Sequence, residues 1–527
     1  MILQNAQTKR LVSVHGWSGV ILGLILYAVI VTGTAAVFKK ELTIWSAGSV
    51  SSANPVTVAP IADTVRQLAA QTPKEYHDDL NIFPTLGNQL QIFFHKHFVT
   101  PEGETKEKGV SWVVDAQRNV VSRDEGIADQ FPKENSSFLG HFFVDLHVRL
   151  HLPNPYGLIL TGILGLAMLV AAVSGLLIHG HLIRDLFTIR QRKEKLVAWR
   201  DLHTVAATWT LPHAFILAFT GAYFSFAIAV GFPLLTQIAF NGDREAAIAA
   251  FIGAPPHVDP TPAPLGDLDA IIADARTRVN SPVFGLIIEH FGRADAKATV
   301  RFDVGEKKLV PPSIIYNAAT GSFVTEKPVI GTTPSVGSTT LMLMGPLHFG
   351  NFAGWLSKAA WFALGAASAY VTVSGLALFV RKRREQSGAR FLGAATSWMT
   401  VSLPLAMSIS AAGFFLSKAA GTSEFWTAAA FLMSAASSLL IALAYKPERS
   451  GRILLALLAV SLLGLAPLRL LTGGLSWVQA IQTGQPDIIA VDLLVTLGGV
   501  LCGWSLLKAR EETSIPSVMS ATSQAAE

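Results

Sequence analysis

Four histidines border long apolar runs of this chain, at positions that repeat along the sequence. His15 and His203 stand near the start of two runs, and His151 and His348 stand just before two others. Ionisable side chains in or beside lipid are costly and usually functional, and a neutral imidazole is a common metal ligand. The only cysteine is Cys502. An intramolecular disulfide, a thiolate iron–sulfur cluster and a multi-cysteine zinc site are therefore excluded, so any redox centre must use histidine.

Three further histidines are alternatives to these four. His147 precedes His151 by four residues, so a helix would place both on one face and either could be the ligand there. His179 ends the second apolar run and could replace one ligand at the opposite face. His213 lies ten residues beyond His203, at a costly midplane position that suits either a redox role or a packed, hydrogen-bonded imidazole. The HKH motif at 95–97 is too short to indicate a metal site.

An internal duplication relates the four border histidines. Its unit is an apolar span, a polar segment and a second span, used twice, so that His15 corresponds to His203 and His151 to His348. The last third of the chain contains no histidine. It looks like an appended bundle. Three sets of landmarks match: His15 and Thr32-Gly33 with His203 and Thr220-Gly221, LHLPNPYG at 150–157 with LHFGNFAG at 347–354, and VSGLLI at 173–178 with VSGLAL at 373–378.

The composition is that of a polytopic membrane protein. With 51% hydrophobic and only 15% charged residues, the 527-residue chain has too little polar surface for a soluble globule of its size. About 20 apolar residues suffice to cross a bilayer. Eight stretches meet that length, at about 11–38, 157–180, 204–230, 355–380, 394–417, 424–445, 452–472 and 487–507.

The positive charges predict how these spans are oriented. Lys9 and Arg10 precede the first span, and the loops between spans two and three, four and five, and six and seven are basic. By the positive-inside rule, both termini and these loops lie in the cytoplasm of a multi-pass protein of the bacterial inner membrane. The first span has no small-residue cleavage site and is expected to be retained. The net charge of +5 thus reflects contact with the lipid bilayer, and we expect no nucleic acid as a partner.

The two long polar segments then lie outside the cytoplasm. Each has an amphipathic helix pattern, at 61–71 and 265–279, followed by runs of alternating apolar residues. The expected fold is therefore a polytopic α-helical membrane protein of about eight transmembrane helices with two small α+β extracytoplasmic domains. The expected segments are a first helix (1–38), a first outside domain (39–156), helices two and three (157–230), a second outside domain (231–354), helix four with its basic loop (355–390), a four-helix bundle (391–510) and a disordered tail (511–527).

The sequence resembles the PepSY-associated transmembrane proteins over about 8–390. The strings that carry the resemblance are VHGWSGVILGLILYAVIVTG, DLHTVAATWTLPHAFILAFTG, LHFGNFAGW and the two VSGL span ends. The family pairs PepSY domains outside the cytoplasm with histidine-bearing spans. Some members act in iron acquisition as haem-containing reductases of ferric siderophores. This chain departs from the family where an arginine usually follows the first histidine, since Gly16 and Thr204 stand there, and it adds four further spans.

The resemblance implies two b-type haems, each held by two neutral histidines. His15 and His203 would hold the cytoplasmic haem, and His151 and His348 the outer one, with His147, His179 and His213 as alternatives. The activity implied is reduction of a ferric siderophore or another iron chelate at the periplasmic side.

Electrons must come from a separate cytoplasmic or membrane donor, because no dinucleotide or Walker fingerprint is present and the cytoplasmic loops are short. Two other functions stay open. The chain could be a non-redox accessory protein whose outside domains bind a partner, or a transporter for an iron chelate.

Overall fold

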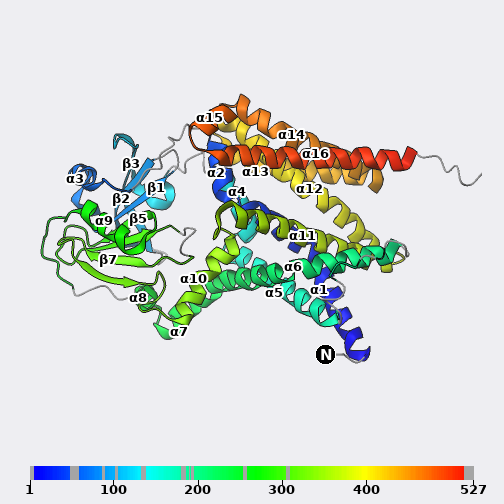
Figure 1. Ribbon diagram of the computed structural model, residues 1–527, viewed down its shortest axis with the longest axis horizontal. Coiled ribbons are helices and arrows are strands. Elements are labelled where there is room, and N and C mark those ends of the chain that lie inside the picture. The colour runs from blue at the N-terminus through cyan, green and yellow to red at the C-terminus, as the bar shows by residue number, and fades with distance from the viewer. Residues whose placement is uncertain are drawn as a thin grey trace, which may run out of the picture.

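A computed structural model describes a helical bundle with a β-sheet domain at one of its ends (Figure 1). In Figure 1 the sheet lies to the left and the long helices to the right. The described residues are 5–47, 58–85, 89–100, 105–131, 138–179, 186–188, 190, 195–252, 258–303 and 309–514.

The described part of the chain contains eight helices that are long and apolar enough to cross a membrane. Each corresponds to one predicted span, but the third is longer than 204–230. There α6 (Lys195–Phe226) passes through a π-helical turn (Ala227–Gly231) into α7 (Phe232–Ala239). The eight candidate spans are Ala6–Ala36, Tyr156–Ile178, Val197–Ala239, Gly354–Lys382, Ser387–Ala420, Ser423–Ala444, Pro447–Leu471 and Pro486–Lys508.

The two repeats form a four-helix arrangement. Helices α1 (Asn5–Ala36) and α6 each pack against both α5 (Tyr156–Ile178) and α11 (Gly354–Lys382). A short helix then packs along the first long helix of each repeat. These short helices are α4 (Phe138–Arg149), which lies along α1, and α10 (Val336–Phe349), which lies along α6.

These short helices differ from the sequence-based assignment of 39–156 and 231–354 to outside domains. Besides α4 and α10, α2 (Lys39–Ala47) packs against both α4 and α16 (Pro486–Ser514). The buried face of α4 carries Leu139, Phe142, Phe143 and Leu146, which join the core of the bundle. A helix of this length is too short to be recognised as a span, so its apolar face was assigned to the polar segment.

The C-terminal helices cover one side of this arrangement. They are α12 (Ser387–Ser417), α13 (Ser423–Ala444), α14 (Pro447–Leu471), the short α15 (Trp477–Gln482) and α16. A buried polar network joins them to α2. The Asp492 carboxylate accepts hydrogen bonds from Arg469 Nη2 (2.6 Å), Trp45 Nε1 (2.7 Å) and Trp477 Nε1 (2.8 Å). The appended bundle is thereby fixed to the repeat region.

The sheet domain is one continuous antiparallel sheet of eight strands. Its order is β4-β3-β2-β1-β5-β6-β7-β8, and the strands of the two repeats meet where β1 pairs with β5. The strands are β1 (Asp79–Thr85), β2 (Gln89–Val99), β3 (Thr105–Val114), β4 (Val120–Ile127), β5 (Val283–Glu289), β6 (Lys297–Phe302), β7 (Ser313–Asn317) and β8 (Phe323–Lys327).

Two helices pack on this sheet and also connect the repeats. Helix α3 (Ala62–Gln71) and helix α9 (Leu268–Val279) share one hydrophobic core with the strands. The Asp269 carboxylate of α9 accepts hydrogen bonds from the backbone N–H groups of Ile61 (2.7 Å) and Ala62 (3.3 Å), at the start of α3. The predicted helices and strands are therefore present, but the two polar segments share one sheet and one core rather than forming two separate bodies.

The remaining helices are short. They are α8 (Arg244–Ile252) and the 3-10 turns η1 (Lys74–Tyr76), η2 (Ala128–Gln130) and η5 (Lys418–Ala420).

Candidate functional site

Two imidazoles face each other at the end of the bundle nearest the sheet. His147 lies near the end of α4 and His348 near the end of α10, with ring centroids 6.2 Å apart and an interplanar angle of 33°. We call these two residues the sheet-proximal pair. A metal–imidazole bond is about 2.0 Å long, so two axial imidazoles on one metal have centroids roughly 6 Å apart. The spacing is that of two rings on either side of one metal ion.

Each ring of the sheet-proximal pair is oriented by a hydrogen bond at Nδ1. His147 Nδ1 lies 2.9 Å from the backbone carbonyl oxygen of Val29 on α1, which can only accept. His348 Nδ1 lies 2.8 Å from Thr220 Oγ1 on α6. Because the Thr220 hydroxyl donates its own hydrogen to the Ile216 carbonyl (2.6 Å), it accepts from His348. Both imidazoles thus carry a hydrogen on Nδ1.

A second pair lies toward the other end of the bundle, and we call it the sheet-distal pair. His15 Nδ1 on α1 contacts the carbonyl oxygen of Ala171 (3.0 Å) and Ser174 Oγ (3.2 Å) on α5. His203 Nδ1 on α6 contacts Ser374 Oγ (2.9 Å) on α11. The two side chains are close enough to interact electrostatically. The equivalence of His15 and His203 in the duplication is therefore matched by equivalent contacts.

A glycine lies against each of the four imidazoles. In the sheet-proximal pair, a Cβ added at Gly33 would lie 2.7 Å from His147 Cε1, and one added at Gly221 would lie 3.2 Å from His348 Cε1. In the sheet-distal pair, a Cβ added at Gly375 would lie 3.1 Å from His203 Cε1, and one added at Gly175 would lie 3.3 Å from His15 Cε1. The 2.7 Å distance at Gly33 is shorter than real Cβ atoms show, and the other three are tighter than most real Cβ contacts, so the absence of a side chain lets each ring approach the neighbouring helix closely. The Thr-Gly and Ser-Gly landmarks of the repeat are the positions against which the rings pack.

The hydrogen bonds at the four Nδ1 atoms determine which ring nitrogen can bind a metal. With the hydrogen on Nδ1, a neutral imidazole has its lone pair on Nε2, which is the atom free to bind a metal. Partners of this kind fix the tautomer and orientation of histidine ligands in metal sites. The donor set is four neutral imidazoles in two pairs, and the sequence repeat aligns the two members of the sheet-distal pair, His15 and His203.

His151 does not belong to the sheet-proximal pair, contrary to the sequence-based prediction. Helix α4 ends at Arg149, and both Leu150 and His151 have positive φ, at 53° and 54°. The chain has therefore left the helix before His151. Its ring is exposed and lies on Phe142, with centroids 4.4 Å apart. His147, one turn earlier, faces α1 and takes the position that the LHLPN and LHFGN match had assigned to His151.

His213 is buried without a hydrogen-bond partner. It is 4% exposed, and neither ring nitrogen has a partner among the described residues. Its ring meets that of Trp361 edge-on, with centroids 5.3 Å apart, and it interacts electrostatically with His348. The sequence-based alternative was a packed, hydrogen-bonded core imidazole; the described residues show the packing but no hydrogen bond, and a redox role stays a prediction.

His179 caps the end of α5, one turn beyond Gly175, and its buried Nδ1 has no partner among the described residues. The contacts described do not join His179 to either pair. His181, which follows it, lies outside the described residues.

A different set of ligating side chains lies in the sheet domain. Asp79, His95 and His97 bring their ligand atoms within 4.8 Å of one another. Glu107 Oε1 lies 3.9 Å from His95 Nε2 and 3.7 Å from His97 Nε2. Hydrogen bonds to Asp79 and then Glu107 raise the pKa of His97 to about 10. The sequence interpretation of HKH missed this cluster, because its carboxylates come from other strands.

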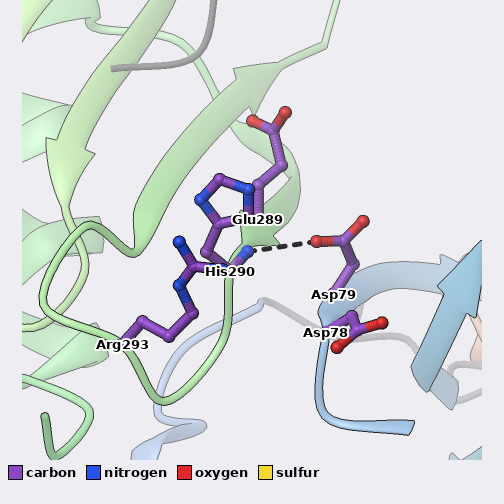
Figure 2. A pocket seen from close by; sticks show the side chains of 5 residues that line it. All are labelled: Asp78, Asp79, Glu289, His290 and Arg293. Atoms are coloured by element: carbon purple, nitrogen blue, oxygen red, sulfur yellow. Dashed lines mark hydrogen bonds between the residues drawn. The ribbon is translucent and has the colours of Figure 1, made fainter. Parts of the chain in front are cut away.

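A polar pocket of about 300 Å³ adjoins Asp79 at the place where the two repeats meet. It is lined by Asp78, Asp79, Glu289, His290 and Arg293, and Figure 2 shows these side chains converging from the blue and green halves of the sheet. The dashed line in Figure 2 is the hydrogen bond from the backbone N–H of His290 to Asp79 Oδ1 (3.1 Å). One carboxylate oxygen of Asp79 is thereby fixed.

Comparison with known proteins identifies the family to which the helical bundle belongs. Residues 12–382 match the family model described as the PepSY-associated TM region. The chain belongs to this family. One similar protein is an uncharacterised protein of Pseudomonas aeruginosa, which is 26% identical over an alignment of 266 positions; the alignment covers 47% of this chain and 64% of that protein. The match thus covers less than two thirds of that relative.

Within this PepSY-associated TM protein, the family match includes both histidine pairs and the helices that position them. It ends at α11, before the C-terminal helices begin. Together with the eight apolar helices, the family assigns the chain to multi-pass membrane proteins.

Proposed function

We propose that this chain is a haem-b electron-transfer protein of the bacterial inner membrane that reduces ferric iron, bound to a siderophore or another chelate, at the periplasmic side. The observation that carries the proposal is the sheet-proximal pair, whose ring centroids are 6.2 Å apart with both Nδ1 atoms hydrogen-bonded. Two imidazoles so arranged would hold one haem between them through their Nε2 atoms. A haem held by two histidines would serve electron transfer rather than oxygen binding.

The fit extends to the second pair and to the number of cofactors. His15 and His203, like the sheet-proximal pair, have hydroxyl or carbonyl acceptors at Nδ1. Along α6, His203 and Gly221 are 18 residues apart, a rise of about 27 Å. Two haems, one held by each pair, would therefore lie toward opposite faces of a bilayer about 30 Å thick. A bound haem supplies one-electron chemistry, which is what conversion of one ferric to one ferrous ion requires.

The protein's own residues would hold and orient the cofactors. The four Nε2 atoms bind, the Nδ1 partners fix the rings, and the close glycine contacts prevent the rings from turning. The basic loops support an orientation with both termini in the cytoplasm and the sheet domain in the periplasm. A bulky ferric chelate would then approach the sheet-proximal haem from water, while a separate cytoplasmic or membrane donor supplies electrons.

An optical spectrum of the purified protein tests this proposal. Reduction should produce a split visible band, and pyridine extraction should give about two haems b per chain. His348→Ala should lose one haem and should no longer reduce an added ferric chelate after chemical pre-reduction. His203→Ala should lose the other haem.

Absence of haem from the purified parent would contradict the proposal and favour a non-redox accessory protein. Retention of haem together with parental ferric reduction in His348→Ala would show that the outer end of the conduit lies elsewhere. An iron-chelate transporter is the second candidate, and it is favoured by the buried imidazole of His213, which has no hydrogen-bond partner in the part of the chain that the structure describes. Uptake of a labelled chelate by vesicles, lost in His213→Ala with haem retained, would distinguish it.

A further inference from the structure

A cluster of two carboxylates and two imidazoles lies on one face of three neighbouring strands of the sheet domain. Its members are Asp79, His95, His97 and Glu107. Asp79 on β1 is directly opposite His95 on β2, and His97 on β2 is directly opposite Glu107 on β3. Residues two apart on a strand point to the same face, so His95 and His97 project together. The result is two imidazoles and two carboxylates collected from three strands.

Among the described residues, the Nε2 atom of His95 makes no hydrogen bond to the other three groups of the cluster. His95 Nδ1 lies 3.3 Å from the carbonyl oxygen of Phe93, which can only accept, so the lone pair of the neutral ring is on Nε2. That Nε2 faces Glu107 Oε1 at 3.9 Å, beyond hydrogen-bonding distance. Two acceptors facing each other are unfavourable unless a cation lies between them. The His95 side chain is only 3% exposed.

Charge pairing alone accounts for only part of this arrangement. A protonated His97 bridges Asp79 Oδ2 (3.3 Å) and Glu107 Oε1 (3.7 Å). It donates nothing to His95. A metal ion bound to His95, His97 and the carboxylates would replace the proton and satisfy all four groups.

We infer that Asp79, His95, His97 and Glu107 form a binding site for a divalent transition-metal ion. Mixed imidazole and carboxylate ligands suit ions such as Zn²⁺ or Fe²⁺ and are poorly suited to Ca²⁺ or Mg²⁺, which prefer oxygen. The His290 backbone N–H holds Asp79 Oδ1, which directs Oδ2 toward His97. This is the kind of outer hydrogen bond that orients carboxylate ligands. The His97 side chain is 48% exposed, which gives the ion access from solvent.

The site does not depend on the proposed haem chemistry, because it lies in the sheet domain and uses no residue of either histidine pair. It can be tested on the full chain without a polyhistidine tag, by calorimetric titration with Zn²⁺ alone and by elemental analysis after dialysis. We expect one Zn²⁺ per chain. His97→Ala should weaken binding on the order of a hundredfold, because it removes a ligand from a half-exposed position with little packing.

Two further variants keep the test decisive. Glu107→Gln keeps the size of the side chain but removes the charge of the carboxylate ligand. It should also weaken Zn²⁺ binding. His151→Asn removes an exposed histidine outside the cluster, and asparagine tolerates the positive φ of that position. It should leave the affinity unchanged. All variants should match the parent in size-exclusion profile and thermal unfolding. Absence of stoichiometric Zn²⁺ binding, or equal affinity in the parent, His97→Ala and Glu107→Gln, would overturn the inference and leave the cluster as an ion-paired edge of the sheet.

Discussion

The imidazole of His147 packs against Gly33 so closely that a Cβ added to the glycine would lie 2.7 Å from its Cε1 atom. The glycine is on α1 and the histidine on α4, and the Val29 carbonyl, one turn before Gly33, accepts the Nδ1 hydrogen bond. The position of the His147 ring is therefore fixed by backbone atoms of α1. Rotation of neighbouring side chains cannot easily change it.

Gly33→Ala should disturb the proposed sheet-proximal haem while leaving the sheet-distal haem intact. The new methyl group must displace the His147 ring, which changes the Nε2 position. We expect partial loss of one haem or a shifted reduced spectrum. Gly19→Ala is the matched control, because nothing lies within 4 Å of a Cβ added there on the same helix. It should retain both haems, and equal spectra for the two variants would contradict the role of the close contact.

His147→Ala should remove one haem from the purified protein, whereas His151→Asn should remove none. The reason is that His147 faces His348 at 6.2 Å while His151 is exposed beyond the end of α4. Haem content by pyridine extraction distinguishes the two. Loss of haem in His151→Asn with full retention in His147→Ala would restore the pairing suggested by the sequence match.

Ser374→Ala removes the hydroxyl acceptor for His203 Nδ1, 2.9 Å away, and leaves the Val371 carbonyl as the remaining partner of the ring. Loss of such an outer hydrogen bond typically weakens metal binding by about 10- to 100-fold and makes the imidazole a poorer donor. We therefore expect weaker retention of the sheet-distal haem and a more positive midpoint potential, measured by redox titration. Ser368→Ala is the control, since the Ser368 hydroxyl donates to the Leu364 carbonyl of its own helix. It should leave the potential at the parental value.

Asp492→Ala should strongly destabilise the chain. It leaves the Arg469 guanidinium, 1% exposed, without its carboxylate, and it removes the acceptor of Trp45 and Trp477. Breaking a buried ion pair on one side typically costs about 3–5 kcal/mol. Thermal unfolding of the purified protein should show a much lower midpoint than in Glu424→Ala, a change at an exposed position of α13. Similar midpoints would mean that the network contributes little.

Much of the membrane part is predictable from sequence because its signals are local. A long apolar run indicates a span wherever it occurs, and eight such runs correspond to the eight candidate helices. The duplication also aligned His15 with His203, and their contacts to Ser174 and Ser374 are equivalent. The C-terminal end of the third span lies beyond the predicted residue 230 because α6 continues through a π-helical turn into α7.

The choice between His147 and His151 required the tertiary structure. Their spacing of four residues fits one helix face only if the helix includes both, and α4 ends between them. The hydrophobic pattern locates a helix end to within a few residues, and here that margin separates a buried ring from an exposed one. The packing of α4 against α1 shows that His147, rather than His151, faces His348.

The sheet domain shows the same division between local and distant information. Alternating apolar residues predicted individual strands, but the β1–β5 pairing joins residues about 200 positions apart and leaves no local pattern. Asp79 and Glu107 reach His95 and His97 only because strand register places them opposite. The sequence by itself determined the spans, the repeat and the types of ligand available, since these follow from local composition. Which ligands meet was decided by the tertiary structure, because helix ends and strand registers depend on packing between distant segments.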